Sequence, residues 1–404
     1  MGKPASLSSL SFSHGPFCKS QAPFAITRCI EVVHHRMGLP TPHFARLQPG
    51  LSPLPSLAAE ATRLARFVPP FQFTSFFAPE DTLLCVIAAE GALEGLREGR
   101  AHRRAEGPRV GANLRDGTPS GNGAAGLRIV ELTTGSGLVG LRMLDLEPEA
   151  TLVGVDIDDD APKVAGANAF GLGLADRARF EQASIWDGDL ERGLLADPVD
   201  VLVCNPPYVP EPPGANLPVE AGAGPDGAAH VRRVIEIADM TRPSTLVLSW
   251  CSLCDPAGIV ADAEQAGYRL NALYVVAIAD GEYSGGVHGY LRGLSGAFLS
   301  DQPDVIAMVA PDGAARFAYL LLAGVFANDR SSASPAAQRR VPGDSAAAVD
   351  HLMHEFVRRG EEALIAPAAP FPVTTWLLDR WDEISLRAFL HGPLSVVAGR
   401  GLSA

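Results

Sequence analysis

The stretch LRIVELTTGSGLVGLRMLDL, residues 127–146, sets the fold class of this chain. It contains an apolar strand pattern from Leu127 to Leu132, a glycine-rich turn over Thr133–Gly137 and a helical pattern from Leu138 to Leu146. Glycine lets a backbone turn tightly, and a helix amino terminus adds partial positive charge and free N–H groups. The stretch therefore predicts the first strand–turn–helix unit of a Rossmann-like α/β domain, with a ligand at the turn.

The acidic residue before this turn limits the class of ligand that the turn can bind. Gly135, Gly137 and Gly140 follow the spacing G-x-G-x-x-G, which alone is a weak indication of a dinucleotide site. Glu131 lies at the end of the strand, where a carboxylate repels a pyrophosphate and attracts the cationic amino-acid end of S-adenosylmethionine. We therefore assign Glu131, Thr133, Gly135 and Gly137 to an S-adenosylmethionine site.

The next predicted strand, Thr151–Val155, ends in an acid. Asp156 lies about 20 residues beyond the glycine turn, where a ribose-binding carboxylate is expected. Ile157 follows it and is assigned to the same cofactor site. The acids at 158–160 are more typical of a solvated helix start, because carboxylates complement the helix dipole.

A third strand, Ala178–Gln182, leads to the expected adenine subsite. In such folds a polar group and an apolar side chain hold the adenine there, and Ser184 and Ile185 are assigned to these roles. Trp186 is interpreted either as a further adenine contact or as a core residue.

The apolar run Val201–Cys204 ends in Asn205-Pro206-Pro207-Tyr208. Prolines fix φ and restrict the preceding residue, so Asn205 is held on a stiff turn at the carboxyl edge of the sheet, where open α/β sheets bind ligands. An ordinary proline-rich turn would have the same four letters. The earlier cofactor signals favour a catalytic turn, with Asn205 also bordering the cofactor.

This turn suits methyl transfer to a planar nitrogen. An amide or aromatic amine is a poor nucleophile because its lone pair is delocalised, so orientation is the missing contribution. The Asn205 side-chain oxygen and the Pro206 carbonyl can accept hydrogen bonds from an NH₂ group and align it with an electrophilic methyl group. Tyr208 is expected to stack on the planar acceptor.

Residues 76–267 resemble the HemK/PrmC-type methyltransferases, which modify the side-chain amide of glutamine with S-adenosylmethionine and are related to the amino-methyltransferases of adenine and cytosine. Besides the glycine turn, Ala78–Thr82 resembles the Pro-x-Glu-Thr element of the family, Asn205–Pro210 its signature, and Ala221–Gly227 its later glycine-rich loop. The resemblance covers roughly half of the chain. It implies a seven-stranded Rossmann-like sheet and a glutamine side chain of a protein as acceptor.

The chain departs from that family at several points. Thr133 stands where the family carries glycine, and a β-branched residue disfavours positive φ, so a remodelled cofactor turn is expected. Ser184 replaces the usual aspartate, and the stretch at 281–290 has no counterpart. These departures leave a small metabolite or peptide open as the acceptor. They also leave open a binding or scaffolding protein that keeps the fold without turnover.

Composition limits the remaining classes. The chain has 404 residues, which is more than a single hydrophobic core usually holds, so two or more structural units are expected. A net charge of −13 argues against nucleic acid as partner, and no apolar run reaches the length of a membrane helix, so a cytoplasmic enzyme is expected. The six cysteines show no disulfide framework. Cys251 and Cys254 lack a second ligand pair, so core thiols are favoured and no metal site is assigned.

Composition shifts divide the chain into five predicted parts. These are a mostly helical accessory region at 1–106, a linker or loop at 107–126, the cofactor-binding catalytic domain at 127–328, a linker at 329–348 and a helical carboxy-terminal extension at 349–404.

The later patterns predict four further features. Leu270–Ile278 is expected to end the sheet together with a hairpin of 305–309 and 316–322, and residues 281–293 are expected to form a mobile substrate loop. Two amphipathic helices are predicted at 349–364 and 374–390. This pair would pack on the core, cover the site or form a homodimer contact.

Overall fold

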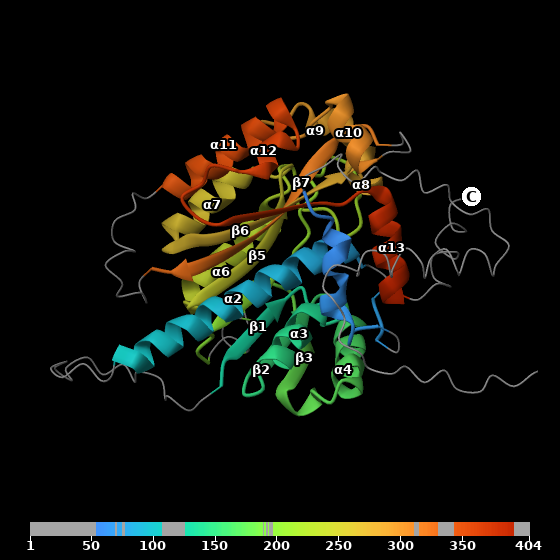
Figure 1. Cartoon of the computed structure of the whole chain (residues 1–404). Coiled ribbons are helices and arrows are strands. Elements are labelled where there is room, and N and C mark those ends of the chain that lie inside the picture. Colours follow the sequence, from blue (N-terminus) through green and yellow to red (C-terminus); the bar gives the residue numbers. More distant parts are fainter. Residues whose placement is uncertain are drawn as a thin grey trace, which may run out of the picture. The chain divides into compact units, whose positions relative to one another are not determined.

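The computed structural model describes residues 54–68, 71–74, 77–106, 126–188, 190, 193, 197–310, 315–329 and 343–391, all within one compact unit. At its centre lies an eight-stranded sheet with the order β3-β2-β1-β4-β5-β7-β6-β8 (Figure 1). The strands are β1 (Arg128–Leu132), β2 (Thr151–Asp156), β3 (Ala178–Gln182), β4 (Val201–Cys204), β5 (Thr245–Cys251), β6 (Tyr268–Ala279), β7 (Ala318–Asn328) and β8 (Val373–Leu377).

The sheet is parallel except at β7. This strand runs antiparallel to both of its neighbours, β5 and β6, whereas β1 lies parallel between β2 and β4. The strand order reverses between β1 and β4, and such a reversal opens a crevice at the carboxyl ends of the strands. The Rossmann-like prediction is confirmed, and the predicted cofactor and acceptor turns follow the two strands that flank the reversal.

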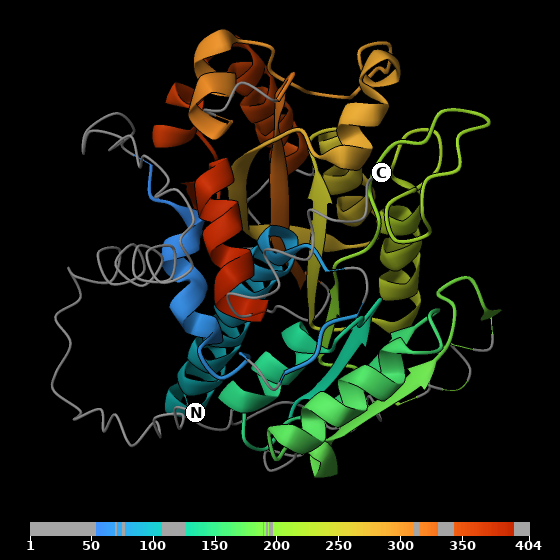
Figure 2. The ribbon, with the colours of Figure 1, turned by 90° about the vertical axis from the view of Figure 1, so that its right-hand side faces the viewer.

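Helices cover both faces of the sheet (Figures 1 and 2). Right-handed crossovers place α3 and α4 on one face and α6 on the other, because the chain runs away from β1 in opposite directions. The helices are η1 (Leu57–Leu64), α2 (Pro79–Glu106), α3 (Leu138–Leu146), α4 (Ala161–Gly171), η2 (Ala175–Arg177), α6 (Ala229–Thr241), α7 (Pro256–Gln265), α8 (Glu282–Gly286), α9 (His288–Leu291), α10 (Pro303–Val309), α11 (Asp344–Arg359), α12 (Glu362–Ile365) and α13 (Arg380–His391).

The core lies between the central strands and these helices. Every residue of β5 is buried, and β7 is buried along nearly its whole length. Strands covered on both faces read as continuous apolar runs rather than alternating ones. Trp250 and Phe326 are fully buried, and their ring centroids lie 6.0 Å apart across this strand pair. The rigid centre of the sheet thus supports the strand ends that carry the predicted site.

The carboxy-terminal region differs from its prediction. The segment expected to be one helix at 374–390 divides into strand β8 and helix α13, and β8 adds an eighth strand parallel to β6. Its sequence, VTTWL, is rich in β-branched and aromatic residues, which suit a pleated strand better than a helix. The helix expected at 349–364 is also two elements, α11 and α12, divided at Gly360 with φ +62°.

The predicted hairpin is wrong in its first arm. Residues 303–309 form helix α10, with Pro303 in its first turn, a position that tolerates a missing N–H. The second arm is part of β7, which pairs with β6 and β5 instead of with residues 305–309.

The expected loop at 281–293 contains two short helices, α8 and α9. The Ser284 side chain accepts a hydrogen bond from the Gly281 backbone N–H at 3.0 Å and so caps the first of them. Its glycine content suggested a loop, but a local cap favours a helical turn.

The segment at 54–57 extends the sheet edge. The Leu377 N–H donates to Pro55 O at 3.0 Å, and the Ser56 hydroxyl donates to Asp382 at 2.5 Å in helix α13. Residues 1–53 of the predicted accessory region and most of the predicted linkers at 107–126 and 329–348 lie outside the described residues, so the five-part division stays a prediction. None of the described helices combines the length and apolarity that crossing a bilayer requires.

Candidate active site

The glycine turn after β1 is held from several sides. Gly135 and Gly137 have φ of +50° and +78°, which side chains rarely adopt. The Thr134 N–H donates to Val155 O at 2.9 Å, and the Gly135 N–H donates to an Asp156 carboxylate oxygen at 2.8 Å. The turn is therefore fixed against the end of β2.

Thr133 opens the cofactor turn in a strained backbone conformation. It adopts φ +53°, in the left-handed region that glycine would occupy, although a β-branched side chain is strained there. Its hydroxyl lies 2.6 Å from Leu132 O, 3.1 Å from Asn205 O and 3.3 Å from Cys204 Sγ. Threonine therefore takes the positive φ that its side chain disfavours, because polar contacts hold the strained conformation, and a remodelled turn stays a prediction.

Glu131 points into the turn. It is 4% exposed, and its carboxylate accepts hydrogen bonds from the Thr134 hydroxyl at 2.6 Å and from the Gly140 backbone. Burial raises the pKa of Glu131 to about 7, although these hydrogen bonds oppose the shift. The contacts show a carboxylate that braces the turn from inside, and its predicted attraction for the cofactor's amino group stays a prediction.

Asp156, the predicted ribose carboxylate, lies at the end of β2 against the cofactor turn. Its two oxygens accept backbone N–H groups from Gly135 at 2.8 Å and Asp158 at 3.0 Å. Burial raises its pKa, and these backbone hydrogen bonds oppose that shift. A carboxylate offers about four lone-pair positions, so acceptor capacity remains for two ribose hydroxyls. The residues present therefore fit the cofactor.

The predicted adenine subsite exposes apolar surface. Ile157 and Trp186 are each 53% exposed, after β2 and β3 respectively, so Trp186 is not a core residue. Ile185 is buried, and the Ser184 hydroxyl oxygen accepts the Trp186 N–H at 3.2 Å. The Ile185 carbonyl accepts from Arg233 at 2.8 Å, which ties this loop to α6.

A residue that sequence reasoning missed links the cofactor turn to the amino-terminal region. Asn168 of α4 is 4% exposed, and its side-chain amide donates to Ser136 O at 3.0 Å and Gln72 O at 2.7 Å. Its oxygen accepts the Gln72 N–H at 2.8 Å. The segment at 71–74 thus lies against the turn, where Thr74 Oγ1 would be 3.8 Å from a Cβ placed on Gly135. No local pattern around Asn168 signals this contact.

Asn205 follows β4 beside the cofactor turn. Its side-chain oxygen is buried and has no hydrogen-bond partner. An unsatisfied buried acceptor costs about 1–3 kcal/mol, so a donor supplied there would be bound favourably. Pro206 is buried, and Thr133 contacts the Asn205 carbonyl. The two predicted turns therefore meet at these residues.

Tyr208 is buried, and a side chain of helix α2 holds its hydroxyl. It is 8% exposed, and its hydroxyl donates to Asp81 in the first turn of α2. Burial raises the pKa of Asp81 and, more strongly, of neighbouring Glu80, which faces Arg387 of α13 at 3.8 Å. The element Ala78–Thr82 thus holds the acceptor turn from α2, and the predicted stacking by Tyr208 stays a prediction.

The glycine-rich loop at 221–227 closes against the same turn. The Val209 N–H donates to Ala221 O at 3.0 Å, and Val209 O accepts the Ala223 N–H at 3.0 Å. Tyr290 of α9 donates its hydroxyl to Pro225 O at 2.8 Å. The region predicted as a substrate loop therefore contacts the loop beside the acceptor turn.

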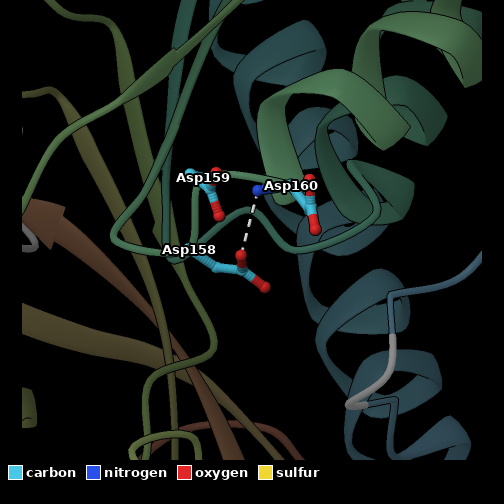
Figure 3. Close-up of side chains that lie close together, drawn as sticks. All are labelled: Asp158, Asp159 and Asp160. Carbon is cyan, nitrogen blue, oxygen red and sulfur yellow. Dashed lines mark hydrogen bonds between the residues drawn. The ribbon is translucent and has the colours of Figure 1, made fainter.

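The acidic run after β2 lies directly before α4, with Asp160 at the N-cap position of the helix (Figure 3). Asp158, Asp159 and Asp160 are exposed, with ligand atoms within 4.8 Å of one another. The Asp160 N–H donates to an Asp158 carboxylate oxygen at 2.9 Å, the dashed line of Figure 3, and Lys163 pairs with both Asp159 and Asp160. These contacts confirm the helix-start interpretation.

The thiols near the acceptor turn are core groups, as predicted. Cys204, Cys251 and Cys254 are fully buried, and the sulfur atoms of the last two lie 4.0 Å apart. Burial raises the pKa of Cys251 and Cys204, which disfavours the reactive thiolate.

Part of the chain that carries this site matches a known family of domains. Residues 122–213 match the family model "Methyltransferase small domain". This segment includes β1, the glycine turn, β2, β3, β4 and the acceptor turn. The fold and the match define a methyltransferase domain, and S-adenosylmethionine is the cofactor that they indicate.

The chain also resembles a ribosomal protein uL3 glutamine methyltransferase of Bordetella pertussis, at 37% identity over 91 residues. The match spans 20% of this chain and 29% of that protein. Among solved structures, a precorrin-6y C5,15-methyltransferase of Geobacter metallireducens aligns at TM-score 0.28 and 16% identity, over 49% of this chain and 79% of its own. The YcgJ protein of Bacillus subtilis aligns at TM-score 0.32 and 13% identity, over 52% and 94% respectively.

Proposed function

We propose that this protein is an S-adenosylmethionine-dependent N-methyltransferase of the HemK/PrmC type that acts on a planar nitrogen. The acceptor that we favour is a glutamine side-chain amide of a protein. One observation carries the proposal: the buried Asn205 side-chain oxygen, without a partner, lies on the turn that contacts the cofactor turn.

The chemistry follows from the groups at this turn. S-adenosylmethionine supplies an electrophilic methyl group when bound. The Asn205 oxygen and the Pro206 carbonyl accept the two N–H donors of a primary amide and direct the nitrogen toward that methyl group. Orientation by these acceptors also favours a localised lone pair. The nitrogen becomes acidic as it gains the methyl group, so its proton can leave to solvent without a dedicated base.

Binding and exclusion of water come from the surrounding residues. Asp156 provides acceptor capacity for the ribose, and the exposed faces of Ile157 and Trp186 provide apolar area for an adenine. Asp81 holds Tyr208, and α9 contacts the loop at 221–227. The glutamine methyltransferase of Bordetella pertussis supports the amide acceptor, over the part of the chain that it matches.

A second candidate is a binding protein that keeps the fold without turnover. The replacement of glycine by Thr133 and of aspartate by Ser184 is the feature that favours it. The contacts of Thr133 weaken this case, because they hold the residue at a positive φ that glycine adopts without strain.

Methyl transfer from labelled S-adenosylmethionine to fractionated cell extract tests the proposal. Label should enter a protein fraction and should appear as N-methylglutamine after enzymatic digestion, because acid hydrolysis would remove the amide. Asn205→Ala serves as the inactive control. Label confined to small molecules would move the acceptor to a metabolite or peptide. Cofactor binding by calorimetry without any transfer would favour the non-catalytic alternative.

A further inference from the structure

Thr133 combines a strained backbone with polar contacts to two strands. It is one of three non-glycine residues with positive φ in the described part of the chain, and the only β-branched one among them. A β-branched residue in the left-handed region persists only when its surroundings hold it there. A glycine would take the same φ without strain. What threonine adds at this position is its hydroxyl and one methyl group.

The hydroxyl spans the strand pair that flanks the reversal in strand order. Leu132 and Cys204 are register partners at the ends of β1 and β4, and Thr133 and Asn205 follow them directly. Thr133 Oγ1 lies 2.6 Å from Leu132 O and 3.1 Å from Asn205 O. A hydroxyl has one proton, so the two carbonyl oxygens share it.

Cys204 can complete this arrangement. Its Sγ lies 3.3 Å from Thr133 Oγ1, and burial raises the pKa of the Cys204 thiol, so the proton stays on sulfur. The S–H group can therefore donate to the hydroxyl oxygen, whose own proton is directed at the carbonyl groups. The hydroxyl then accepts from sulfur and donates to the two carbonyl oxygens, one of which belongs to Asn205.

We propose that Thr133 is a positioning residue whose hydroxyl fixes the Asn205–Pro206 peptide and so couples the acceptor turn to the cofactor turn. The inference rests on the proposed function, because the peptide that it fixes carries the Asn205 side chain and leads into the Pro206 carbonyl. The Asn205 side-chain oxygen has no hydrogen-bond partner in the protein. Its position therefore depends on the backbone that carries it, which the Thr133 hydroxyl holds.

Three substitutions separate the hydroxyl from the shape and from the strain. Thr133→Ser keeps the hydroxyl and loses the methyl group. Thr133→Val keeps the shape and loses the hydroxyl. Thr133→Gly relieves the strain and loses both the hydroxyl and the methyl group. It provides a second variant without the hydroxyl if the valine variant does not fold.

The direct measurement is the carbonyl ¹³C signal of Asn205 in protein labelled at the asparagine backbone carbonyl. Its signal is assigned by its loss in Asn205→Ala, and a hydrogen bond to a carbonyl shifts it downfield. We expect Thr133→Ser to keep the signal near its wild-type position, and Thr133→Val and Thr133→Gly to move it upfield. This shift needs no acceptor and no bound cofactor.

Two further measurements connect the contact to function. Methyl transfer into the protein fraction should fall about 10- to 100-fold in the valine and glycine variants, as for loss of one hydrogen bond that orients a reacting group. Affinity for S-adenosylmethionine, measured by calorimetry, should change by less than that in Thr133→Gly, because glycine keeps the turn. The serine variant should restore both the signal and the transfer.

The coupling is overturned if the carbonyl signal stays in place in the valine and glycine variants, or if serine behaves like valine, since methyl packing would then account for threonine. An unmoved transfer rate beside a moved signal also overturns it, because the contact would not serve the reaction. Failure of the proposed function has a different result: wild-type protein would transfer no methyl group to any fraction, while the carbonyl signals would still report the contact.

Discussion

The turn after β1 and the turn after β4 lie side by side at the same edge of the sheet but differ in how fully they are bonded. In the cofactor turn, the strand before it, β2 and α4 all contribute hydrogen bonds, through Glu131, Asp156 and Asn168. In the acceptor turn, Asn205 keeps a buried oxygen without a partner. Under the proposed function, the fully bonded turn is preorganised for the cofactor, and the unsatisfied acceptor is left for a donor that arrives with the substrate.

The largest expected effect tests the open turn. Asn205→Ala should lower turnover by roughly 10²–10³, as removal of one preorganised hydrogen-bonding group typically does, while affinity for S-adenosylmethionine stays within a few-fold of wild type. Asn205→Asp keeps an acceptor oxygen and should retain part of the activity. The measurement is turnover with labelled cofactor, beside calorimetric affinity.

Asn271→Ala is the matched control for that experiment, because Asn271 is exposed on β6. Near wild-type turnover in Asn205→Ala would make Asn205 a structural turn residue. The comparison between a closed turn and an open turn would then lose its functional meaning.

The second effect tests the closed turn. Asp156→Ala should weaken S-adenosylmethionine binding about ten- to a hundredfold, because a hydrogen bond to a charged group contributes about 1.5–3 kcal/mol. Calorimetric titration gives the affinity, and circular dichroism checks that the protein remains folded. Asp159→Ala is the control, because Asp159 is an exposed acid three residues further along the chain, just before α4. Equal affinities for the two variants would remove Asp156 from the cofactor site.

A third prediction concerns Glu80, the buried acid next to the Asp81 that holds Tyr208. Burial raises the pKa of Glu80, with Asp81 and Glu383 adding to the shift and Arg387 opposing it. The native state then binds more protons than the unfolded state between the ordinary pKa of glutamate and the raised one. The free energy of unfolding should therefore fall as pH rises through this window, by up to about 1.4 kcal/mol per pH unit for one proton.

Glu80→Gln should flatten this decline, which urea unfolding at several pH values measures. Glu355→Gln provides the contrast. Arg358 and Arg359 lower the pKa of Glu355 to about 2, so its contribution is present above the ordinary glutamate pKa and is lost as pH falls. A decline of the same slope in wild type and Glu80→Gln would show that Glu80 does not titrate in this way.

The smallest effect concerns the cover over the acceptor turn. Tyr290→Phe removes the hydroxyl that donates to Pro225 O, and a neutral hydrogen bond contributes about 0.5–1.5 kcal/mol. The Michaelis constant for the protein acceptor should rise by up to about tenfold, with cofactor affinity unchanged. Tyr268→Phe, which loses buried bonds to Ala238 and Pro243 carbonyls away from the site, should lower stability without moving that constant. Acceptor kinetics that respond equally to both variants would assign Tyr290 a purely structural role.

Local patterns predicted the elements that build the site. The strands before both turns and helix α3 lie within one or two residues of their expected bounds, because periodicity and turn residues are encoded over short windows. Prediction was weaker where propensity and pattern conflicted. In β8, an amphipathic spacing suggested a helix, but pairing with β6 at the sheet edge favoured a strand.

The sequence by itself determined the order of the turns, the residue types at their tips and hence the class of chemistry. Tertiary structure alone decided how these residues are held, since the contacts join distant positions: Tyr208 to Asp81 across 127 residues, Gln72 to Asn168 across 96 and Ser56 to Asp382 across 326. Thr133 shows the same division. Its residue type predicted strain, but only the end of the neighbouring strand β4 supplied the carbonyl and the thiol that hold it. Hydrogen bonds depend on positions in space, which a local sequence pattern does not contain.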